Sequence, residues 1–305
     1  MKPSQPLFTY LALALAVIFW GLSFVATKVA LQSFTPFCLI FFRFFAASIF
    51  FMILFCRKGF PKLTSKSLKS LMFLALMQPG LYFTFETIGL QYTSATKTSL
   101  ILATIPVVVL VLSTVMLGER LRRVNLFGIM LSLGGVAILV FGEKKHTAFG
   151  GALFGDLLIV GAVLAASSYM VMTRRLGNSL SSLHITGIQI IFGALLFFPA
   201  FLWDLPKLNW QEVSTDSLIA LVGLTVFATI CGFLCYNYAL TKVPAARASV
   251  SLNTIPLVTA FGAWVILGES LTTLQLIGAA VVLIAIFLAN HSPKADPREA
   301  IMGEV

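Results

Sequence analysis

The chain has 305 residues, of which 59% are hydrophobic and only 10% charged, and its mean hydropathy is +0.98. A soluble domain of this length needs far more charge to cover its surface, so the composition excludes a soluble globular protein. The net charge of +10 at pH 7 does not indicate a nucleic-acid partner. Most basic residues fall in alternate connections between apolar segments, as the positive-inside rule of membrane proteins requires.

The apolar segments have the length of membrane-spanning helices, which need about 20 residues to cross a bilayer. The connections between them are too short to form a soluble domain, and the first segment is too long for the apolar part of a secretory signal peptide. The sequence therefore predicts an all-α polytopic membrane protein. In chain order, we expect ten spans at about residues 7–31, 36–56, 68–91, 95–117, 122–142, 151–173, 182–203, 216–240, 246–267 and 271–290.

An internal repeat divides these spans into two sets of five. Residues 89–140 align with residues 239–290 at a constant spacing of 150 residues, and sixteen of the 52 aligned pairs are identical. Such a repeat in a membrane protein is typical of transporters. The shared motifs are Thr104-Ile105-Pro106, which returns as Thr254-Ile255-Pro256, and Leu117-Gly118-Glu119, which returns as Leu267-Gly268-Glu269.

The second repeat is predicted to be inverted, because five spans bring the chain out on the opposite side of the membrane. The charges agree with this prediction. Basic residues at 120–123 are replaced by uncharged ones at 270–273, and the basic stretch 57–69 corresponds to the acidic stretch 204–216. We therefore expect two inverted five-helix repeats, residues 1–145 and 146–291, and a tail over residues 292–305. The tail and both termini are predicted to be cytoplasmic.

A set of short motifs carries a family resemblance that covers residues 7–290. The motifs are Phe19-Trp20-Gly21 with Lys28, Arg43-Phe44, residues 86–95, the two repeated motifs above and Gly155-Asp156. They resemble those of the EamA family of the drug/metabolite transporter superfamily. The resemblance implies ten helices in two inverted bundles, with spans one, three, four, six, eight and nine around a central cavity and spans five and ten at the periphery. It also implies export of amino acids, other metabolites or drugs.

Charged residues inside the spans are informative because each costs about 2.5–3.5 kcal/mol to insert. In a continuous helix Gln78, Tyr82 and Glu86 share one face, since they are four residues apart. The Glu86 carboxylate could bind a substrate ammonium or carry an exchanged proton, or it could form a structural ion pair with Arg43 or Lys28; the sequence leaves both open. The other charges at the spans are Lys97 and Asp156.

Aromatic and polar side chains of other spans complete the predicted substrate site. Trp20, Phe24 and Lys28 form a stripe on the first span, where Lys28 could bind a carboxylate or anchor the helix at the membrane interface. Pairing or snorkelling is the favoured role for Arg43. The predicted substrate-binding residues are Trp20, Phe24, Lys28, Gln78, Tyr82, Glu86, Tyr169, Tyr236, Asn237 and Asn253.

The repeated motifs place Pro106 and Pro256 inside the fourth and ninth spans, where proline removes a backbone hydrogen bond. These residues could be kinks that bend during transport, or static packing kinks. The glycines of the repeated Gly-Glu pairs suit helix C-caps. Glu119 and Glu269 are interpreted as structural residues that cap the helix following each of them.

The predicted function is a secondary transporter of the bacterial inner membrane that exports amino acids or related small metabolites by alternating access. The alternative is an exporter of drugs or other organic cations by proton exchange; a membrane protein without transport activity is the least supported reading. No nucleotide-binding motif, metal-ligand spacing or catalytic dyad is visible, so we expect no cofactor, no metal and no enzymatic activity. The expected partners are the lipid bilayer and a small-molecule substrate, and a homodimer is left open.

Overall fold

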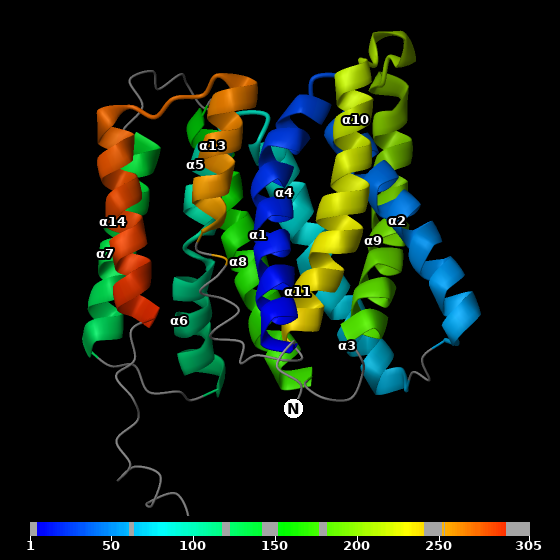
Figure 1. The fold of residues 1–305 in the computed structure, drawn as a ribbon, viewed down its shortest axis with the longest axis horizontal. Coiled ribbons are helices and arrows are strands. Elements are labelled where there is room, and N and C mark those ends of the chain that lie inside the picture. Colours follow the sequence, from blue (N-terminus) through cyan, green and yellow to red (C-terminus); the bar gives the residue numbers. More distant parts are fainter. Residues whose placement is uncertain are drawn as a thin grey trace, which may run out of the picture.

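The computed structural model describes residues 5–60, 64–117, 123–141, 152–176, 182–240, 252 and 254–290. Within these ranges the chain is helical and contains no β-strand, and the helices run side by side in one bundle (Figure 1). Among the described residues, six helices are long and apolar enough to cross a membrane, and three shorter apolar helices accompany them. The predicted all-helical membrane fold is therefore confirmed.

Some predicted spans are continuous helices, and others are interrupted. The continuous ones are α1 (Gln5–Ala30), α2 (Pro36–Lys58), α7 (Arg123–Phe141), α8 (Ala152–Leu176), α9 (Ser182–Asp204) and α14 (Thr273–Asn290). One interrupted span consists of α3 (Ser65–Ala75), η1 (Leu76–Leu81) and α4 (Tyr82–Gly89). The next consists of α5 (Ala95–Leu102) and α6 (Ile105–Leu117). The third consists of α10 (Thr215–Gly223), η4 (Leu224–Cys231) and α11 (Gly232–Leu240). Residues 255–267 form α13 (Ile255–Leu267), and two short 3₁₀ turns, η2 (Leu205–Lys207) and η3 (Trp210–Glu212), join α9 to α10.

Local sequence explains several helix ends. Thr35 is extended and Pro36 begins α2, as expected for a residue that fits the first helical position. The Ser94 hydroxyl accepts from the Lys97 N–H at 3.1 Å and caps α5. Thr272 and Gln275 cap α14 reciprocally, each side chain accepting from the backbone N–H of the other.

The packing places α1 in the middle of the bundle. On one side α1 contacts α10, η4 and α11, and on the other it contacts α5 and α13. In the same way α8 packs against α4, α5 and α6. The pair formed by α2 and α9 lies at one edge of the bundle, and the pair formed by α7 and α14 lies at the opposite edge (Figure 1).

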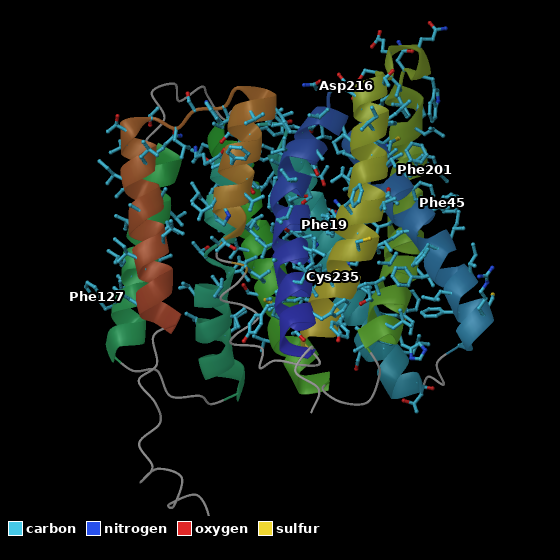
Figure 2. All side chains as sticks on the ribbon, in the orientation of Figure 1. Phe19, Phe45, Phe127, Phe201, Asp216 and Cys235 are labelled. Atoms are coloured by element: carbon cyan, nitrogen blue, oxygen red, sulfur yellow. The ribbon has the colours of Figure 1, made fainter. Side chains whose placement is uncertain are left out.

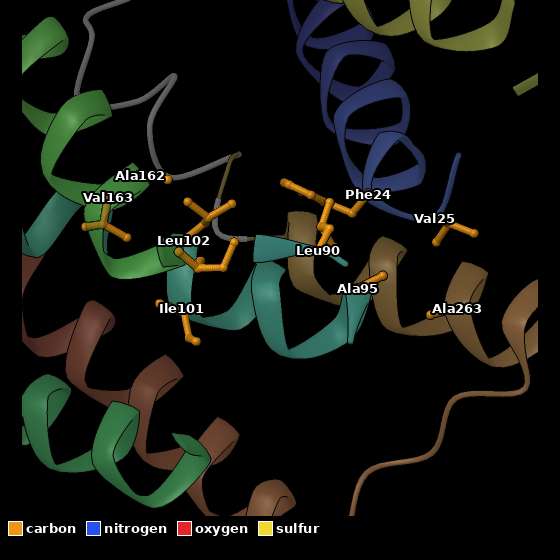
Figure 3. Close-up of a cluster of buried hydrophobic side chains, with 10 residues drawn as sticks. Phe24, Val25, Leu90, Ala95, Ile101, Leu102, Ala162, Val163 and Ala263 are labelled. Atoms are coloured by element: carbon orange, nitrogen blue, oxygen red, sulfur yellow. The ribbon is translucent and has the colours of Figure 1, made fainter. Parts of the chain in front are cut away.

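A buried cluster joins helices from both halves of the sequence (Figure 3). Its members come from α1, α5, α8 and α13 and from Leu90, directly after α4, and they include Phe24, Ile101, Val163 and Ala263. The outer faces of the bundle are apolar as well: Phe127 of α7 is 61% exposed and projects away from the bundle (Figure 2). Because lipid tails are as apolar as these side chains, close packing and polar contacts decide how the helices associate.

Candidate functional site

Two helices of the bundle are interrupted by π-helical turns, η1 and η4. In η1, Gln78 has φ −145° and ψ 115°, far from helical values, and Pro79 follows it. The prediction that Gln78, Tyr82 and Glu86 share one helical face is therefore wrong for Gln78, because the helix is broken there. Only Tyr82 and Glu86 lie on the same regular helix, α4. Such π-helical turns are frequent at functional sites.

In both helices that contain a π-helical turn, a side chain from another helix hydrogen-bonds a backbone carbonyl of that turn. Nε2 of Gln189 in α9 donates to the carbonyl oxygen of Gln78, and Nε1 of Trp20 in α1 donates to the carbonyl oxygen of Ala228 at 3.0 Å. Positions 78 and 228 are 150 residues apart, which is the spacing of the sequence repeat. Inside a membrane, an irregular backbone needs such donors because no bulk water can replace them.

The two donors belong to a group of polar and aromatic side chains from α1, α8, α9 and α11. The hydroxyl of Tyr169 donates to Oε1 of Gln189 at 3.0 Å, and the ring of Trp20 lies 5.0 Å from that of Tyr236, centroid to centroid. Tyr169 and Tyr236 are also close enough to interact electrostatically. The structure thus brings the predicted residues Trp20, Tyr169 and Tyr236 together. Gln189 is not among the predicted residues, although a buried amide in the apolar α9 is a signal that could have found it.

A second polar group surrounds Glu86, which is 2% exposed. The Thr87 hydroxyl donates to Oε2 of Glu86 at 3.1 Å. Arg43, also buried, donates from Nε to the Thr229 hydroxyl in η4, and its guanidinium lies 4.7 Å from the centroid of the Phe83 ring.

The predicted structural ion pair of Glu86 is not formed directly. Among the described residues, neither Arg43 nor Lys28 places a nitrogen within 4.0 Å of a Glu86 oxygen. Arg43, Tyr82 and Glu86 are nevertheless close enough to interact electrostatically. The buried carboxylate of Glu86 therefore lies near the guanidinium of Arg43 without a direct ion pair between the two.

Lys28 takes part in a network at the end of the bundle where α1 ends. Its Nζ lies 3.1 Å from Oε1 of Glu269 and donates to the carbonyl oxygen of Thr93 at 2.8 Å. The Glu269 carboxylate also accepts from the backbone N–H groups of Ala95 at 3.0 Å and Thr96 at 3.1 Å. We call these five residues the Lys28–Glu269 network. It joins α1, the start of α5 and the connection after α13, so the ammonium of Lys28 already has acceptors within the protein.

The network corrects the role expected for Glu269. Gly268 does end α13 with φ +65°, which confirms the predicted C-cap. Glu269, however, caps α5 rather than the following helix α14. Burial alone raises the pKa of the Glu269 carboxyl, but the Ala95 and Thr96 N–H groups and the Lys28 ammonium outweigh it, so the pKa lies below its usual value. Gly118 and Glu119 lie outside the described residues.

Lys97 and Asp156 form an ion pair that was not predicted from the sequence. Lys97 Nζ lies 2.6 Å from Oδ2 of Asp156, and both side chains are 1% exposed. The Thr93 hydroxyl donates to Oδ1 of Asp156 at 2.7 Å. The pair therefore ties the start of α5 to the start of α8, and it accounts for two of the charges found at the predicted spans.

The repeated prolines lie beside breaks in their helices. Pro106 is the second residue of α6, after a turn at Ala103 and Thr104 that ends α5. Pro256 occupies the same place in α13, after Thr254. Bending at these prolines during transport stays a prediction, as does substrate binding by each predicted residue.

The remaining predicted residues are less informative. Phe24 is 5% exposed and lies within the buried cluster of Figure 3. Asn237 lies in α11, and Asn253 lies outside the described residues. In the described part of the chain, no group of three or more His, Cys, Asp and Glu side chains could hold a metal ion.

A bundle of apolar helices, two of them interrupted beside a buried polar group, is the architecture of membrane transporters. The model of the EamA-like transporter family matches residues 7–141 and again residues 153–291. The chain belongs to the EamA-like transporter family.

Relatives from several organisms agree with this family. The uncharacterized transporter YetK of Bacillus subtilis is 30% identical over 294 residues, which are 94% of this chain and 89% of the relative. An uncharacterized transporter of Archaeoglobus fulgidus is 28% identical over 92% of this chain and 97% of its own. A solved crystal structure with 17% sequence identity shares the fold, with a TM-score of 0.65 over 92% of this chain and 97% of that one.

Proposed function

We propose that this protein is a secondary transporter that exports amino acids or related small metabolites across the bacterial inner membrane by alternating access. The observation that carries the proposal is the pair of π-helical turns whose carbonyls, at Gln78 and Ala228, are bonded by one buried group of polar and aromatic side chains. Interrupted helices in corresponding positions of two halves are the usual place of the substrate site in secondary transporters.

The helix contacts support ten spans in two inverted repeats, residues 1–145 and 146–291. If each helix of one half is exchanged for its counterpart, the contact of α1 with α13 becomes that of α8 with α6, and the contact of α1 with α11 becomes that of α8 with α4. The contacts of α2 with α9 and of α7 with α14 map onto themselves. This is the packing expected when a two-fold axis in the membrane plane relates the halves.

The proposed solute lies between α1, α4, α8 and α11. Trp20, Tyr169 and Tyr236 supply aromatic walls with hydrogen-bonding edges. Glu86 supplies a buried negative charge that has no direct ion-pair partner among the described residues. The ammonium group of an amino acid would complete this site, because a buried carboxylate is strongly stabilised by a paired cation.

The same carboxylate supports the second candidate, an exporter of drugs or other organic cations by proton exchange. A cation and a proton could bind Glu86 in turn, so that the release of one would accompany the uptake of the other. Under this candidate, transport of a cation depends on a pH gradient. Under the first candidate, an amino acid crosses either in exchange for protons or down its own concentration gradient.

Proteoliposomes containing the purified full-length protein test both candidates. Amino acids, nucleosides and cationic drugs are offered as labelled solutes at two pH values, with and without a pH gradient. Glu86→Gln is expected to abolish transport while the protein still folds, whereas Glu304→Gln, which makes the same change in charge in the C-terminal tail, leaves transport unchanged. If no solute in the panel is transported, the proposal is wrong. If Glu86→Gln transports as well as wild type, the Glu86 carboxylate takes no part in transport.

A labelling experiment tests the proposed topology, in which both termini are cytoplasmic. The side chain of Lys207 is 48% exposed in η2, so Lys207→Cys in a cysteine-free background should react with a membrane-impermeant maleimide added to intact cells. Reaction only after permeabilisation would place η2 on the cytoplasmic side and overturn the assignment.

A further inference from the structure

An apolar groove of about 530 Å³ lies between α2 and the helix formed by α10 and η4. The groove faces the surrounding lipid, since Phe45 in its wall is 47% exposed and lies at the outer side of α2 in Figure 2. The side chains that shape it are Phe42, Phe45 and Ala46 of α2, Leu218 and Val222 of α10, and Trp210 of η3.

The side chains that line the groove favour an apolar occupant. Apart from the Trp210 indole, the one polar side chain that lines the groove is that of Thr225. The Thr225 hydroxyl already donates to the carbonyl oxygen of Leu221 at 2.9 Å. An occupant therefore needs no hydrogen-bonding group within the groove. A hydrocarbon chain meets this requirement, and lipid supplies such chains along the whole membrane-facing surface.

The end of the groove is acidic. Trp210 belongs to the same turn as Glu212, and Asp216 lies in the first turn of α10, two residues before Leu218. Both carboxylates are on exposed residues, and Asp216 is at the end of the bundle in Figure 2. Nearby, Asp204 and Lys207 neutralise one another at 3.1 Å, so the connection carries a net charge of −2 from Glu212 and Asp216.

We propose that this groove binds one acyl chain of a phospholipid whose headgroup carries an ammonium, namely phosphatidylethanolamine. The ammonium faces Glu212 and Asp216, and the Trp210 ring marks the membrane interface, where tryptophan is enriched. Charge complementarity selects this lipid over an anionic one, because a phosphate without an ammonium would meet two carboxylates.

The bound chain has a structural consequence for the neighbouring polar group. Phe42 precedes Arg43, and Ile230, which also lines the groove, follows Thr229. The hydrogen bond from Arg43 to Thr229 joins the two helices that form the groove walls. An acyl chain in the groove therefore covers this contact from the lipid side. The inference needs only the membrane-spanning fold and does not depend on which solute is transported.

Native mass spectrometry of the full-length protein tests the proposal. The protein is delipidated in detergent and offered phosphatidylethanolamine and phosphatidylglycerol with identical acyl chains. Wild type is expected to retain one phosphatidylethanolamine, with a preference of about tenfold, which corresponds to about 1.4 kcal/mol. Ala46→Phe fills the groove and should lose the bound lipid, whereas Ala280→Phe, at an exposed alanine of α14, should keep it.

Three further variants complete the test, one of them a control. Val222→Phe fills the groove from the opposite wall at a residue that is 60% exposed, so it replaces Ala46→Phe if that variant does not fold. Glu212→Gln with Asp216→Asn should abolish the preference between the lipids, and Asp296→Asn with Glu304→Gln makes the same change in net charge near the C-terminus as a control. Retention of lipid by a folded groove-filling variant, or equal binding of both lipids by wild type, would overturn the proposal.

Discussion

Replacing Glu269 with glutamine is expected to loosen the end of the bundle where α1 ends. One carboxylate oxygen accepts from the Ala95 N–H at 3.0 Å and from Lys28 Nζ at 3.1 Å, and the other accepts from the N–H and hydroxyl of Thr96, both at 3.1 Å. Glutamine has a similar shape but only one acceptor oxygen. Two of these four donors therefore lose their acceptor, and Lys28 loses its counter-ion.

The expected cost follows from the strength of the hydrogen bonds that the substitution removes. Hydrogen bonds to charged groups contribute about 1.5–3 kcal/mol in proteins, whereas polar contacts in a membrane protein averaged about 0.6 kcal/mol in double-mutant cycles. The side chains of Lys28 and Glu269 are 31% and 14% exposed, so water screens part of the attraction. We therefore expect Glu269→Gln to lower the free energy of unfolding by about 2 kcal/mol.

Unfolding of the purified protein by sodium dodecyl sulfate measures this decrease. A double-mutant cycle with Lys28→Met should show a coupling larger than the about 0.3–0.5 kcal/mol seen for independent sites. If the network also keeps this end of the bundle closed, Glu269→Gln should speed maleimide labelling of Ala263→Cys, because Ala263 is completely buried. An additive cycle together with unchanged labelling would refute the reasoning.

Three further predictions concern stability. Since the pKa of Glu269 is lowered, the stability that this carboxylate contributes is complete above the usual carboxyl pKa of about 4.3. This stability is lost as the pH falls through the lowered pKa. The difference in free energy of unfolding between wild type and Glu269→Gln should therefore shrink as the pH falls below about 4.3. Asp156→Asn should cost about 3–5 kcal/mol because it leaves the charge of Lys97 buried, and Lys97→Met combined with Asp156→Leu should recover much of this; no recovery would contradict the ion-pair argument. Gly155→Ala should cost about 1–3 kcal/mol, because its Cβ would lie 2.8 Å from the carbonyl oxygen of Gly89. Gly134→Ala, inside α7 with nothing within 4 Å, should not lower the free energy of unfolding.

The apolar pattern predicted the long helices and most of their ends, because membrane spans are specified by length and hydropathy. Local signals also sufficed for the C-cap at Gly268, which depends on the conformational freedom of one residue. The break at Gln78 was missed, although Gln78-Pro79-Gly80 is a helix-breaking sequence. A strict four-residue spacing assumes an unbroken helix, and that assumption failed there.

The partners of the polar residues could not be predicted from the sequence. Glu269 caps a helix that begins 174 residues earlier, and Gln189 bonds a carbonyl 111 residues away. Such contacts depend on which helices become neighbours, and hydropathy does not specify this in a membrane where every helix is apolar. For the same reason the sequence placed Trp20, Tyr169 and Tyr236 on three helices without showing that they meet.

The two bonded carbonyls limit which residues the chain can accept. At position 20 an N–H of the side chain reaches Ala228 directly, and at position 189 an amide reaches Gln78 while accepting from Tyr169. A phenylalanine at position 20 preserves the aromatic packing but leaves a carbonyl without a donor in an apolar environment. Position 189 is stricter, since its side chain must both donate and accept. We therefore expect variation within the family to keep a donor at position 20 and a donor–acceptor pair at position 189, even where the transported solute changes.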